Sequence, residues 1–362
     1  MTKANFISTH RYSLPEPASA GVRVFAFALF RLLAALTLVA LADPVRAAAR
    51  SSRVPLIVQL DWVANAQFAG LIVAKERGLY AAAGLDVTLR PIDPVEMDAV
   101  APVLRAKDEA WIGCADGTFL LKARAKGAPV RAFATMLQAS PIGVVTLAEH
   151  GVADLSELVG KKIGLHAYNR SQLAIMLGSA GLTLDQVIVV EIGDEIDSLL
   201  SGKIDAQVCY LIDEPVAMER RGAKLRMFPG FQHGYAGYAQ VYFAPEHLLA
   251  RDPALLSRFL SASNEGWRQA LAEPDATAAL VVKKYLAGGD VVYQAESLRK
   301  LAQPLFAETG LTGIGQMRRT TWERSARAAQ VVPETEVAAL LDGFLDFSVL
   351  RAVYPSWTPP AP

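Results

Sequence analysis

The chain opens its ordered pattern with an apolar run followed by a stretch of helical periodicity. Residues 54–60, VPLIVQL, are continuously apolar and rich in β-branched side chains, which is typical of a parallel strand buried on both faces. Residues 66–80, AQFAGLIVAKERGLY, predict a helix. Within this helix Gly70 and Ala74 form a stripe of small residues, where we expect a close approach to the sheet.

The same alternation of strands and helices continues along the first two thirds of the chain. After the first helix we expect strands at 85–92, 110–114, 130–138 and 142–149, and helices at 94–107 and 118–127. This order predicts a doubly wound α/β layer. The pattern then recurs, with strands at 161–167, 186–192, 206–211 and 238–244 and helices at 170–181, 194–203 and 214–222. We therefore predict two similar α/β lobes rather than one long sheet.

The last third changes character and is mainly helical. Apolar residues fall on roughly one face of each segment, as in packing helices, at 253–272, 275–287, 295–310, 321–332 and 334–350. The strand at 238–244 can return the chain to the first lobe. We therefore expect the first lobe to comprise residues 54–140 plus 240–362, the second lobe to comprise residues 141–239, and a ligand cleft to lie between them.

The N-terminal segment has the features of an export signal. Residues 24–42 are almost wholly apolar, are interrupted once by Arg31, and follow several basic residues. Val45-Arg46-Ala47 then offers a small-x-small cleavage pattern. We predict a secretory signal peptide over residues 1–47. The alternative, a membrane anchor, is disfavoured because a span needs about 20 uninterrupted apolar residues.

Composition excludes several classes of function. The chain has 36 basic and 36 acidic residues, so a basic excess that would favour nucleic-acid binding is absent and no nucleic-acid partner is expected. Its two cysteines, Cys114 and Cys209, are too few for a cysteine-based metal site and are expected to be buried thiols. The chain contains no nucleophile elbow, no zinc-binding pair of histidines at helical spacing and no phosphate-binding glycine loop. We therefore expect no catalytic residues, no metal and no cofactor.

Polar and aromatic residues gather where the predicted strands end. In open α/β sheets ligands bind beyond the carboxyl ends of the strands, so these positions are the candidate ligand-binding residues. They are Asp61, Trp62, Asn65, Phe68, Asp116, Thr118, Tyr168, Tyr210 and Glu214.

Each candidate also has a purely structural explanation. Trp62 is expected to stack on a flat ligand, with packing under the lobe as the alternative. Phe68 also fits the apolar face of its helix, and Asp116 is expected to be the N-cap of the helix that follows it. Glu214 has the ordinary preference of acids for a first helical turn. In the cleft its carboxylate can instead accept from an amine or a ring N–H.

The stretch LDWVANAQFAGLIVAKERGLYAAAGLDVTL, residues 60–89, resembles the opening of the NMT/THI-type family of proteins that bind precursors of the thiamine pyrimidine. The segments LLKARAKGAPV, GKIDAQVCYLIDEP and PALLSRFLSASNEGWRQALAEPDATAALVVKKY are similar to later parts of that family. The likeness covers residues from about 54 to about 330. The first stretch is its specific part, because binders of sulfonates, taurine and nitrate share the others.

The resemblance implies a periplasmic solute-binding protein with the type II two-lobed fold. Such a protein is expected to act as a monomer, to bind a small molecule such as a thiamine pyrimidine precursor, and to deliver it to the permease of an ABC importer. By position, Trp62 and Asn65 match the family's ligand-facing loop and Glu214 matches the carboxylate that faces the pyrimidine. Ala64 stands where the family usually has Pro, and Phe68 stands where its synthase branch has His.

Two other functions remain open at this stage. One is the synthase branch of the same family, an enzyme that makes the pyrimidine from its own histidine and a pyridoxal cofactor. The signal peptide, Phe68 at the histidine position and the two cysteines argue against it. The other is a receptor of the same fold for a sulfonate, nitrate or other small anion, for which Arg170 and Thr118 are available.

Overall fold

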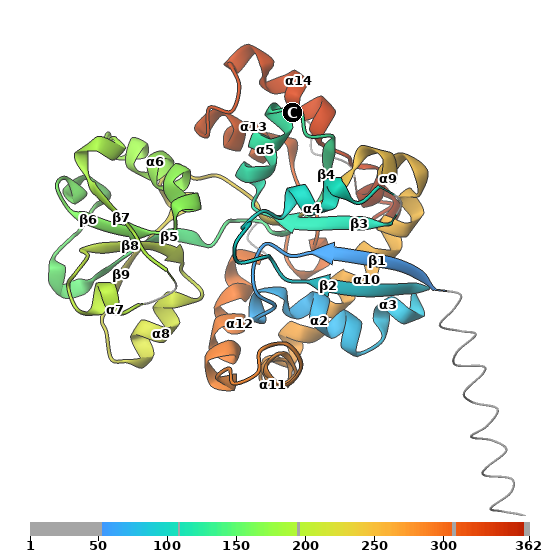
Figure 1. Ribbon diagram of the computed structural model, residues 1–362, viewed down its shortest axis with the longest axis horizontal. Helices are drawn as coiled ribbons and strands as arrows, with labels where there is room; N and C mark the ends of the chain where they lie inside the picture. Colours follow the sequence, from blue (N-terminus) through green and yellow to red (C-terminus); the bar gives the residue numbers. More distant parts are fainter. Residues whose placement is uncertain (1–52, 108, 194–195, 306–308, 358–362) are drawn as a thin grey trace, which may run out of the picture. The chain divides into compact units, whose positions relative to one another are not determined.

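The computed structural model describes residues 53–357 except residues 108, 194–195 and 306–308. The predicted signal peptide, residues 1–47, lies outside the described residues. The described chain contains two five-stranded sheets with helices packed around them (Figure 1). We call the first sheet with the helices that pack on it the first lobe, and the second sheet with its helices the second lobe.

The first sheet has the order β2-β1-β3-β10-β4. Its strands are β1 (Val54–Gln59), β2 (Leu85–Arg90), β3 (Trp111–Ala115), β4 (Val130–Leu137) and β10 (Ala239–Pro245). β1 lies between β2 and β3 and is parallel to both, whereas β10 is antiparallel to β3 and β4. The apolar run at 54–60 is therefore a parallel strand, as predicted, although within β1 only Leu56, Val58 and Gln59 are fully buried. β2 is at the edge of the sheet, and its side chains alternate between buried and exposed.

The second sheet has the order β7-β6-β8-β5-β9. Its strands are β5 (Ile142–Leu147), β6 (Lys162–Leu165), β7 (Ile188–Glu191), β8 (Ala206–Tyr210) and β9 (Leu225–Pro229). β9 was not predicted. It is an edge strand, antiparallel to β5, and most of its side chains are only partly buried, so its sequence LRMFP lacks the continuous apolar run of the other strands.

The chain passes between the two sheets twice. Residues 138–141 lead from β4 to β5, and residues 230–238 lead from β9 back to β10. The two crossing segments are joined by a hydrogen bond from Ser140 N to the Gly237 carbonyl, at 2.9 Å. On this chain path we propose lobe boundaries at 54–140 plus 240–362 for the first lobe and 141–239 for the second.

Two predicted helices are shorter than their sequence patterns. Residues 66–80 form a 3-10 turn (Ala66–Phe68), α2 (Ala69–Glu76) and α3 (Leu79–Ala82), because Gly78 takes the left-handed conformation with φ 77° and interrupts the helix. In the segment 94–107, only α4 (Val100–Arg105) is helical. The carboxylate of Asp98 accepts hydrogen bonds from the backbone N–H groups of Val100 and Ala101 and so caps α4.

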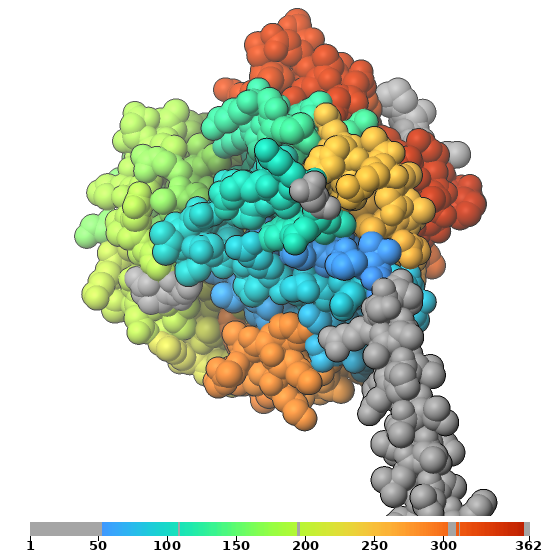
Figure 2. Space-filling view, turned by 45° about the vertical axis from the view of Figure 1, so that its right-hand side comes forward, coloured from blue at the N-terminus to red at the C-terminus, as the bar shows by residue number. Residues whose placement is uncertain are grey.

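The remaining helices mostly follow the predicted pattern. In the first lobe they are α5 (Gly117–Ala125), α9 (Glu246–Arg251), α10 (Pro253–Ala272), α11 (Pro274–Tyr285), α12 (Val291–Leu305), α13 (Arg319–Ala328), α14 (Val337–Phe344) and α15 (Ser348–Val353). In the second lobe they are α6 (Arg170–Ser179), α7 (Asp197–Leu200) and α8 (Glu214–Arg220). However, α9 was not predicted, α7 covers only part of 194–203, and the helix predicted at 334–350 is divided into α14 and α15. Helices α11 and α12 lie at the molecular surface, where they are orange in Figure 2.

The stripe of small residues on α2 packs against a helix, not against the sheet as the sequence had suggested. A Cβ atom added to Gly70 would lie 2.2 Å from Cγ of Trp267, and one added to Gly266 would lie 2.2 Å from the Gly70 carbonyl oxygen. Both Gly266 and Trp267 belong to α10. The backbones of α2 and α10 therefore lie so close together that only glycine fits at positions 70 and 266.

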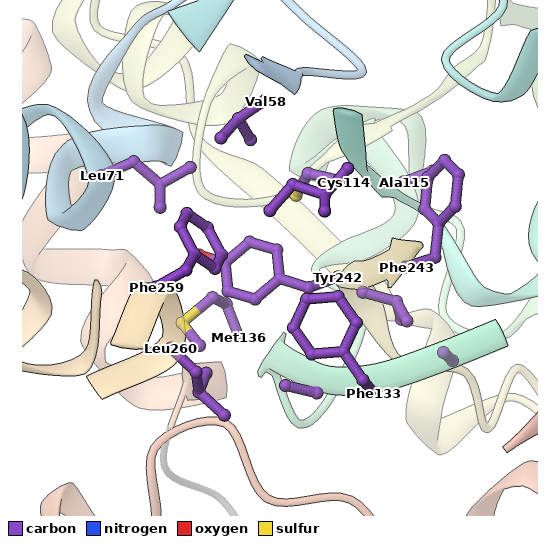
Figure 3. Packing of buried hydrophobic residues seen from close by; sticks show 14 of the residues in the cluster. Val58, Leu71, Cys114, Ala115, Phe133, Met136, Tyr242, Phe243, Phe259 and Leu260 are labelled. Atoms are coloured by element: carbon purple, nitrogen blue, oxygen red, sulfur yellow. The ribbon is translucent and has the colours of Figure 1, made fainter. Parts of the chain in front are cut away.

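The core of the first lobe is aromatic at its centre (Figure 3). Tyr242 of β10 lies between two rings, with centroid distances of 6.2 Å to Phe133 of β4 and 5.2 Å to Phe259 of α10. Cys114 of β3 lies in the same cluster. Both cysteines of the chain are free and buried, which confirms that they act as small apolar side chains.

Charged side chains join the two lobes between α8 and α12. Arg220 of α8 is 2.7 Å from Asp290 and 3.4 Å from Glu296, and Lys300 is 2.6 Å from Glu219. All of these side chains are partly exposed. The hydroxyl of Tyr293 donates to the Asp213 carboxylate beside them. We call the three ion pairs the α8–α12 ion-pair cluster.

Within the described part of the chain, no helix is both long and apolar enough to span a membrane.

Candidate functional site

A cavity of about 620 Å³ is lined by both lobes. This volume is in the middle of the range for sites that enclose a drug-sized ligand. The first lobe contributes the loop after β1, the segment 92–104 and one face of α5, and the second lobe contributes the loops after β6 and β8. The cavity therefore lies beyond the carboxyl ends of parallel strands, where the sequence placed the candidate residues.

Six of the nine candidate residues line this cavity. They are Asp61, Trp62, Asp116, Tyr168, Tyr210 and Glu214. Asp61 and Trp62 follow β1, Asp116 follows β3 and Tyr168 follows β6. Tyr210 ends β8, and Glu214 opens α8 after a loop at 211–213. Segments far apart in the sequence thus bring three carboxylates and three aromatic side chains to one space.

A buried glutamine shapes the loop that carries Asp61 and Trp62. Gln59, the last residue of β1, is 1% exposed, and its amide nitrogen donates to the carbonyls of Leu60 and Pro91 at 2.9 and 3.2 Å. The N–H of Ile92 donates to the Trp62 carbonyl at 3.3 Å. These bonds tie the loop after β1 to the end of β2 and fix the backbone positions of Asp61 and Trp62.

Asp116 is the centre of a buried hydrogen-bond network. Its Oδ1 accepts from the backbone N–H of Thr118 at 2.8 Å, which confirms the predicted N-cap of α5. The hydroxyl of Tyr235 donates to both carboxylate oxygens, at 2.8 and 2.9 Å. Because that proton is used, the Thr118 hydroxyl, 2.8 Å away, donates to the Tyr235 oxygen. Tyr235 comes from the segment that returns to the first lobe, so this network holds the crossing segment against the cavity floor.

Asp61 has a less satisfied environment than Asp116. Its Oδ1 is buried and has no hydrogen-bond partner within the described residues. Burial, with the nearby charge of Asp116 as a second cause, raises the pKa of Asp61 to about 7. Burial raises the pKa of Asp116 to about 6, and the hydrogen bonds from Tyr235 and Thr118 act in the opposite direction. A ligand that donates hydrogen bonds, or carries positive charge, would satisfy the carboxylate of Asp61.

Tyr210 shares the field of these two acids. Its pKa is raised well above the usual value by burial first and by the charges of Asp61 and Asp116 next. Tyr210 therefore keeps its proton at neutral pH and can serve the ligand as a hydroxyl donor or acceptor. This end of the cavity, defined by Asp61, Asp116, Tyr210 and Glu214, is called the acidic end below.

The raised pKa values of these acids predict that the stability of the ligand-free protein depends on pH. A carboxylate with a folded pKa above its unfolded value binds protons more tightly when folded, so folding loses stability as pH rises from about 4 to about 7. Asp61→Asn removes this loss. We expect the variant to melt higher than the wild type at pH 8, and the difference to shrink as pH falls to 4.5. Thermal unfolding across this range measures it, and a difference that is constant with pH would contradict the prediction.

Four aromatic rings form a cluster beside the acidic end. Trp62 lies edge-on to His166 and Tyr168, with ring centroids 5.8 and 6.3 Å away. His166 and Tyr168 are stacked at 5.1 Å, and Phe119 of α5 meets Tyr168 edge-on. Carbon atoms of stacked rings lie about 3.5 Å apart, so a ring between Trp62 and Tyr168 would need about 7 Å and a parallel arrangement. In this conformation a flat ligand can therefore stack on one face of Trp62 but cannot be sandwiched by the pair.

Three candidate residues do not line the cavity. Asn65 is the N-cap of the 3-10 turn, where its Oδ1 accepts from the Gln67 N–H at 3.0 Å. Phe68 is 0% exposed and belongs to the core of the first lobe, so the apolar face of its helix explains it. Thr118 is fully buried behind Asp116 and acts on the site through Tyr235.

Sequence reasoning missed or undervalued several residues of the site. His166 is not among the candidate residues from the sequence, yet it lines the cavity and contacts Trp62. Its place two residues before Tyr168, near the end of the strand predicted at 161–167, was an available signal. Tyr235 lies in a crossing segment with no strand or helix pattern, so nothing in the sequence indicated that it would bind Asp116. Lys122 also lines the cavity, and the only signal for it in the sequence was its helical spacing from Asp116 along the helix predicted there.

Among the described residues, no group of three or more His, Cys, Asp or Glu side chains is arranged to hold a metal ion.

Among proteins of known sequence, several relatives cover much of this chain. A riboflavin-binding protein of Chloroflexus aurantiacus is 28% identical over 226 residues, which are 60% of this chain and 62% of the relative. A formylaminopyrimidine-binding protein of Halalkalibacterium halodurans is 28% identical over 60% of this chain and 67% of its own length. A 4-amino-5-hydroxymethyl-2-methylpyrimidine phosphate synthase of Legionella pneumophila is 24% identical over 71% of this chain and 81% of the relative.

Solved structures show the fold. The periplasmic aliphatic sulphonate binding protein SsuA of Escherichia coli superposes with a TM-score of 0.63, covering 86% of this chain and 94% of that protein at 14% identity. The chain thus has the fold of periplasmic binding proteins, with two α/β lobes, as predicted.

The family model described as "NMT1/THI5 like" matches residues 65–277, which is more than half of the chain. The matched stretch runs from the loop after β1, through the whole second lobe, to α11. It includes four of the six candidate residues that line the cavity, Asp116, Tyr168, Tyr210 and Glu214. The family predicted from residues 60–89 is confirmed, and the chain belongs to the NMT1/THI5 like family.

Proposed function

We propose that this chain is the substrate-binding component of an ABC importer and that it binds a small heteroaromatic solute, such as a thiamine pyrimidine precursor, in the periplasm. The observation that carries the proposal is the pairing of an aromatic surface with the acidic end inside one cavity. Trp62 offers a face for a flat ring, while Asp61 and Glu214 offer acceptors from opposite lobes. An aminopyrimidine presents both a flat ring and N–H donors, so it matches both features at once.

The relatives support this class of ligand without naming the solute. Riboflavin and formylaminopyrimidine, the ligands in the names of two relatives, are both nitrogen heteroaromatics. The fold shared with SsuA supports delivery to a permease, since that protein is a periplasmic binding protein. We infer that the chain acts as a monomer whose two lobes close on the ligand.

A pyrimidine synthase is the second candidate, because several of the relatives are named as such enzymes. Phe68 stands at the position where the resemblance places the histidine of that branch, and it is packed in the core with no exposed surface. A phenyl ring there cannot supply the nitrogen atoms that the reaction takes from histidine. This position favours the binding function.

A receptor for a free anion fits the cavity less well. Arg170 does not line it, and the Thr118 hydroxyl is used by Tyr235. Asp61, Asp116 and Glu214 at the acidic end would repel a sulfonate or nitrate placed there. Two lysines also line the cavity, Lys122 of α5 and Lys126 just after that helix.

A thermal-shift screen tests the proposed function. We expect 4-amino-5-hydroxymethyl-2-methylpyrimidine, its formylamino relative or riboflavin to raise the melting temperature, since a ligand at 100 times its dissociation constant adds about 2.7 kcal/mol to the free energy of unfolding. Ethanesulfonate, taurine and nitrate are the matched anion arm. Stabilisation by the anions alone would overturn the proposal, and pyridoxal absorbance in the purified protein would favour the synthase.

A further inference from the structure

The cavity extends well beyond the acidic end, along one face of α5. The residues of this helix that line it are Asp116, Phe119, Lys122, Ala123 and Lys126. Their spacing of three and four residues places them on a single face. From Asp116 to Lys126 the helix rises about 15 Å, at 1.5 Å per residue. The site thus has an inner end at Asp116 and an outer end near Lys126.

A second wall of the cavity, from the segment 96–104, is mainly apolar. It is formed by Met97 and by Val100, Ala101 and Leu104 of α4. Val100 and Leu104 are partly buried and pack on the core of the first lobe. Together with Ala123 they leave a passage between α4 and α5 with aliphatic walls, which we call the outer compartment.

The charged side chains of the outer compartment are two acids, Glu96 and Asp98, and two lysines, Lys122 and Lys126. Glu96 pairs with Arg105 at 2.9 Å, and Asp98 caps the N-terminus of α4. Lys122, in contrast, lines the cavity, and its side chain forms no ion pair or hydrogen bond with the described residues. It is partly buried, and this burial lowers its pKa, while the charge of Asp116 acts in the opposite direction and that of Lys126 in the same direction.

The volume of the cavity also exceeds what a single substituted ring needs. A water molecule in the liquid takes about 30 Å³, so a 620 Å³ cavity holds the equivalent of about twenty waters, whereas a substituted pyrimidine has only about ten non-hydrogen atoms. A ring held at Trp62 and the acidic end therefore leaves the outer compartment unfilled.

We propose that the outer compartment receives a second part of the ligand, an aliphatic arm that ends in an anionic group such as a phosphate, and that Lys122 binds this anion. The inference rests on the proposed function, because it takes the acidic end as the site of the heteroaromatic ring. An ammonium group at Lys122 and carboxylates at Asp61 and Glu214 then select a ligand that is a hydrogen-bond donor at one end and an anion at the other. A ligand of the reverse polarity would meet like charges at both ends.

Two pairs of compounds that differ only by a phosphate test this assignment. They are riboflavin with flavin mononucleotide, and 4-amino-5-hydroxymethyl-2-methylpyrimidine with its phosphate. Calorimetry at pH 7.5 and constant ionic strength gives the ratio of dissociation constants within each pair. A hydrogen bond to a charged group typically contributes enough for about a tenfold change in affinity. We expect the phosphorylated member of at least one pair to bind about tenfold more tightly to the full-length mature protein.

Substitutions at Lys122 separate its role from a general charge effect. Lys122→Met, with Lys122→Gln as a second variant in case the first folds poorly, is expected to abolish the preference for phosphate and to leave the affinity for the neutral member within about twofold. Lys283→Met on the exposed face of α11 makes the same change in net charge and should keep the preference.

The outcomes distinguish this inference from the proposed function. Neutral rings that bind without any preference for phosphate, or a preference that survives both Lys122 variants, would overturn the outer-compartment assignment and leave the proposed function standing. Failure of all four compounds to bind would overturn both. Loss of the preference in Lys122→Met but not in Lys283→Met supports both.

Discussion

Gly266→Ala is expected to lower the free energy of unfolding by about 3 kcal/mol, the upper part of the range for overpacked cores. The added methyl would lie 2.2 Å from the Gly70 carbonyl oxygen and 2.8 Å from Cβ of Ala74. Neither atom is the end of a flexible side chain, so α2 and α10 must move apart. Trp267, which fills the space above Gly70 and is 0% exposed, would lose contacts on the same movement.

Gly178→Ala is the matched control for this change. Gly178 lies within α6 and is exposed, and nothing lies within 4 Å of a Cβ added there. Alanine favours the helix by about 0.5–1 kcal/mol over glycine, so this variant should be slightly more stable than the wild type. Urea unfolding followed by circular dichroism compares the two. Equal stability of both variants would show that the α2–α10 contact adjusts without cost.

Trp62→Ala is expected to weaken binding of the best ligand from the screen by about tenfold or more. Stacking of a base on an aromatic side chain contributes about 1–3 kcal/mol in nucleic-acid complexes, and 1.4 kcal/mol is a factor of ten in affinity. The loss extends beyond the ligand, because Trp62 also meets His166 and Tyr168 of the second lobe. The variant therefore loses both a surface for the ring and a contact that favours the closed arrangement.

Glu214→Gln tests the opposite side of the same ligand. It keeps the size of the side chain and removes its charge, so we expect a larger loss for an amino-bearing pyrimidine than for a ring without donors. Calorimetry measures both variants, with Trp357→Ala and Glu149→Gln as controls away from the cavity. Circular dichroism confirms that each variant is folded. Wild-type affinity in both Trp62→Ala and Glu214→Gln would mean that the ligand lies elsewhere.

The sequence was most informative where one local signal was sufficient. The apolar run at 54–60 needs no partner to be recognised as a buried strand, and the helical period at 253–272 is long enough to be unambiguous. Asp61, Trp62 and Asp116 were found because the end of a strand is itself a local signal. The residues 60–89 then carried the family, which the matching model confirmed.

The features that could not be predicted depend on contacts between distant segments. The stripe at Gly70 indicated close packing, but its partner, Gly266, is almost two hundred positions away, and nothing local distinguishes a helix from the sheet as that partner. The hydrogen bonds from Tyr235 to Asp116 require the crossing segment to fold back over the first lobe. The sequence around Phe68 is compatible with a side chain in the core or in the cleft, and only the packing of the folded chain shows that it lies in the core.

The α8–α12 ion-pair cluster predicts that ionic strength affects the residence time of the proposed ligand. Its side chains are partly exposed, so each pair contributes at most about 1 kcal/mol and becomes weaker as the salt concentration rises. The pairs join one lobe to the other and do not line the cavity. We therefore expect that salt, by weakening these pairs, shortens the residence time of the proposed ligand while every contact inside the cavity stays the same.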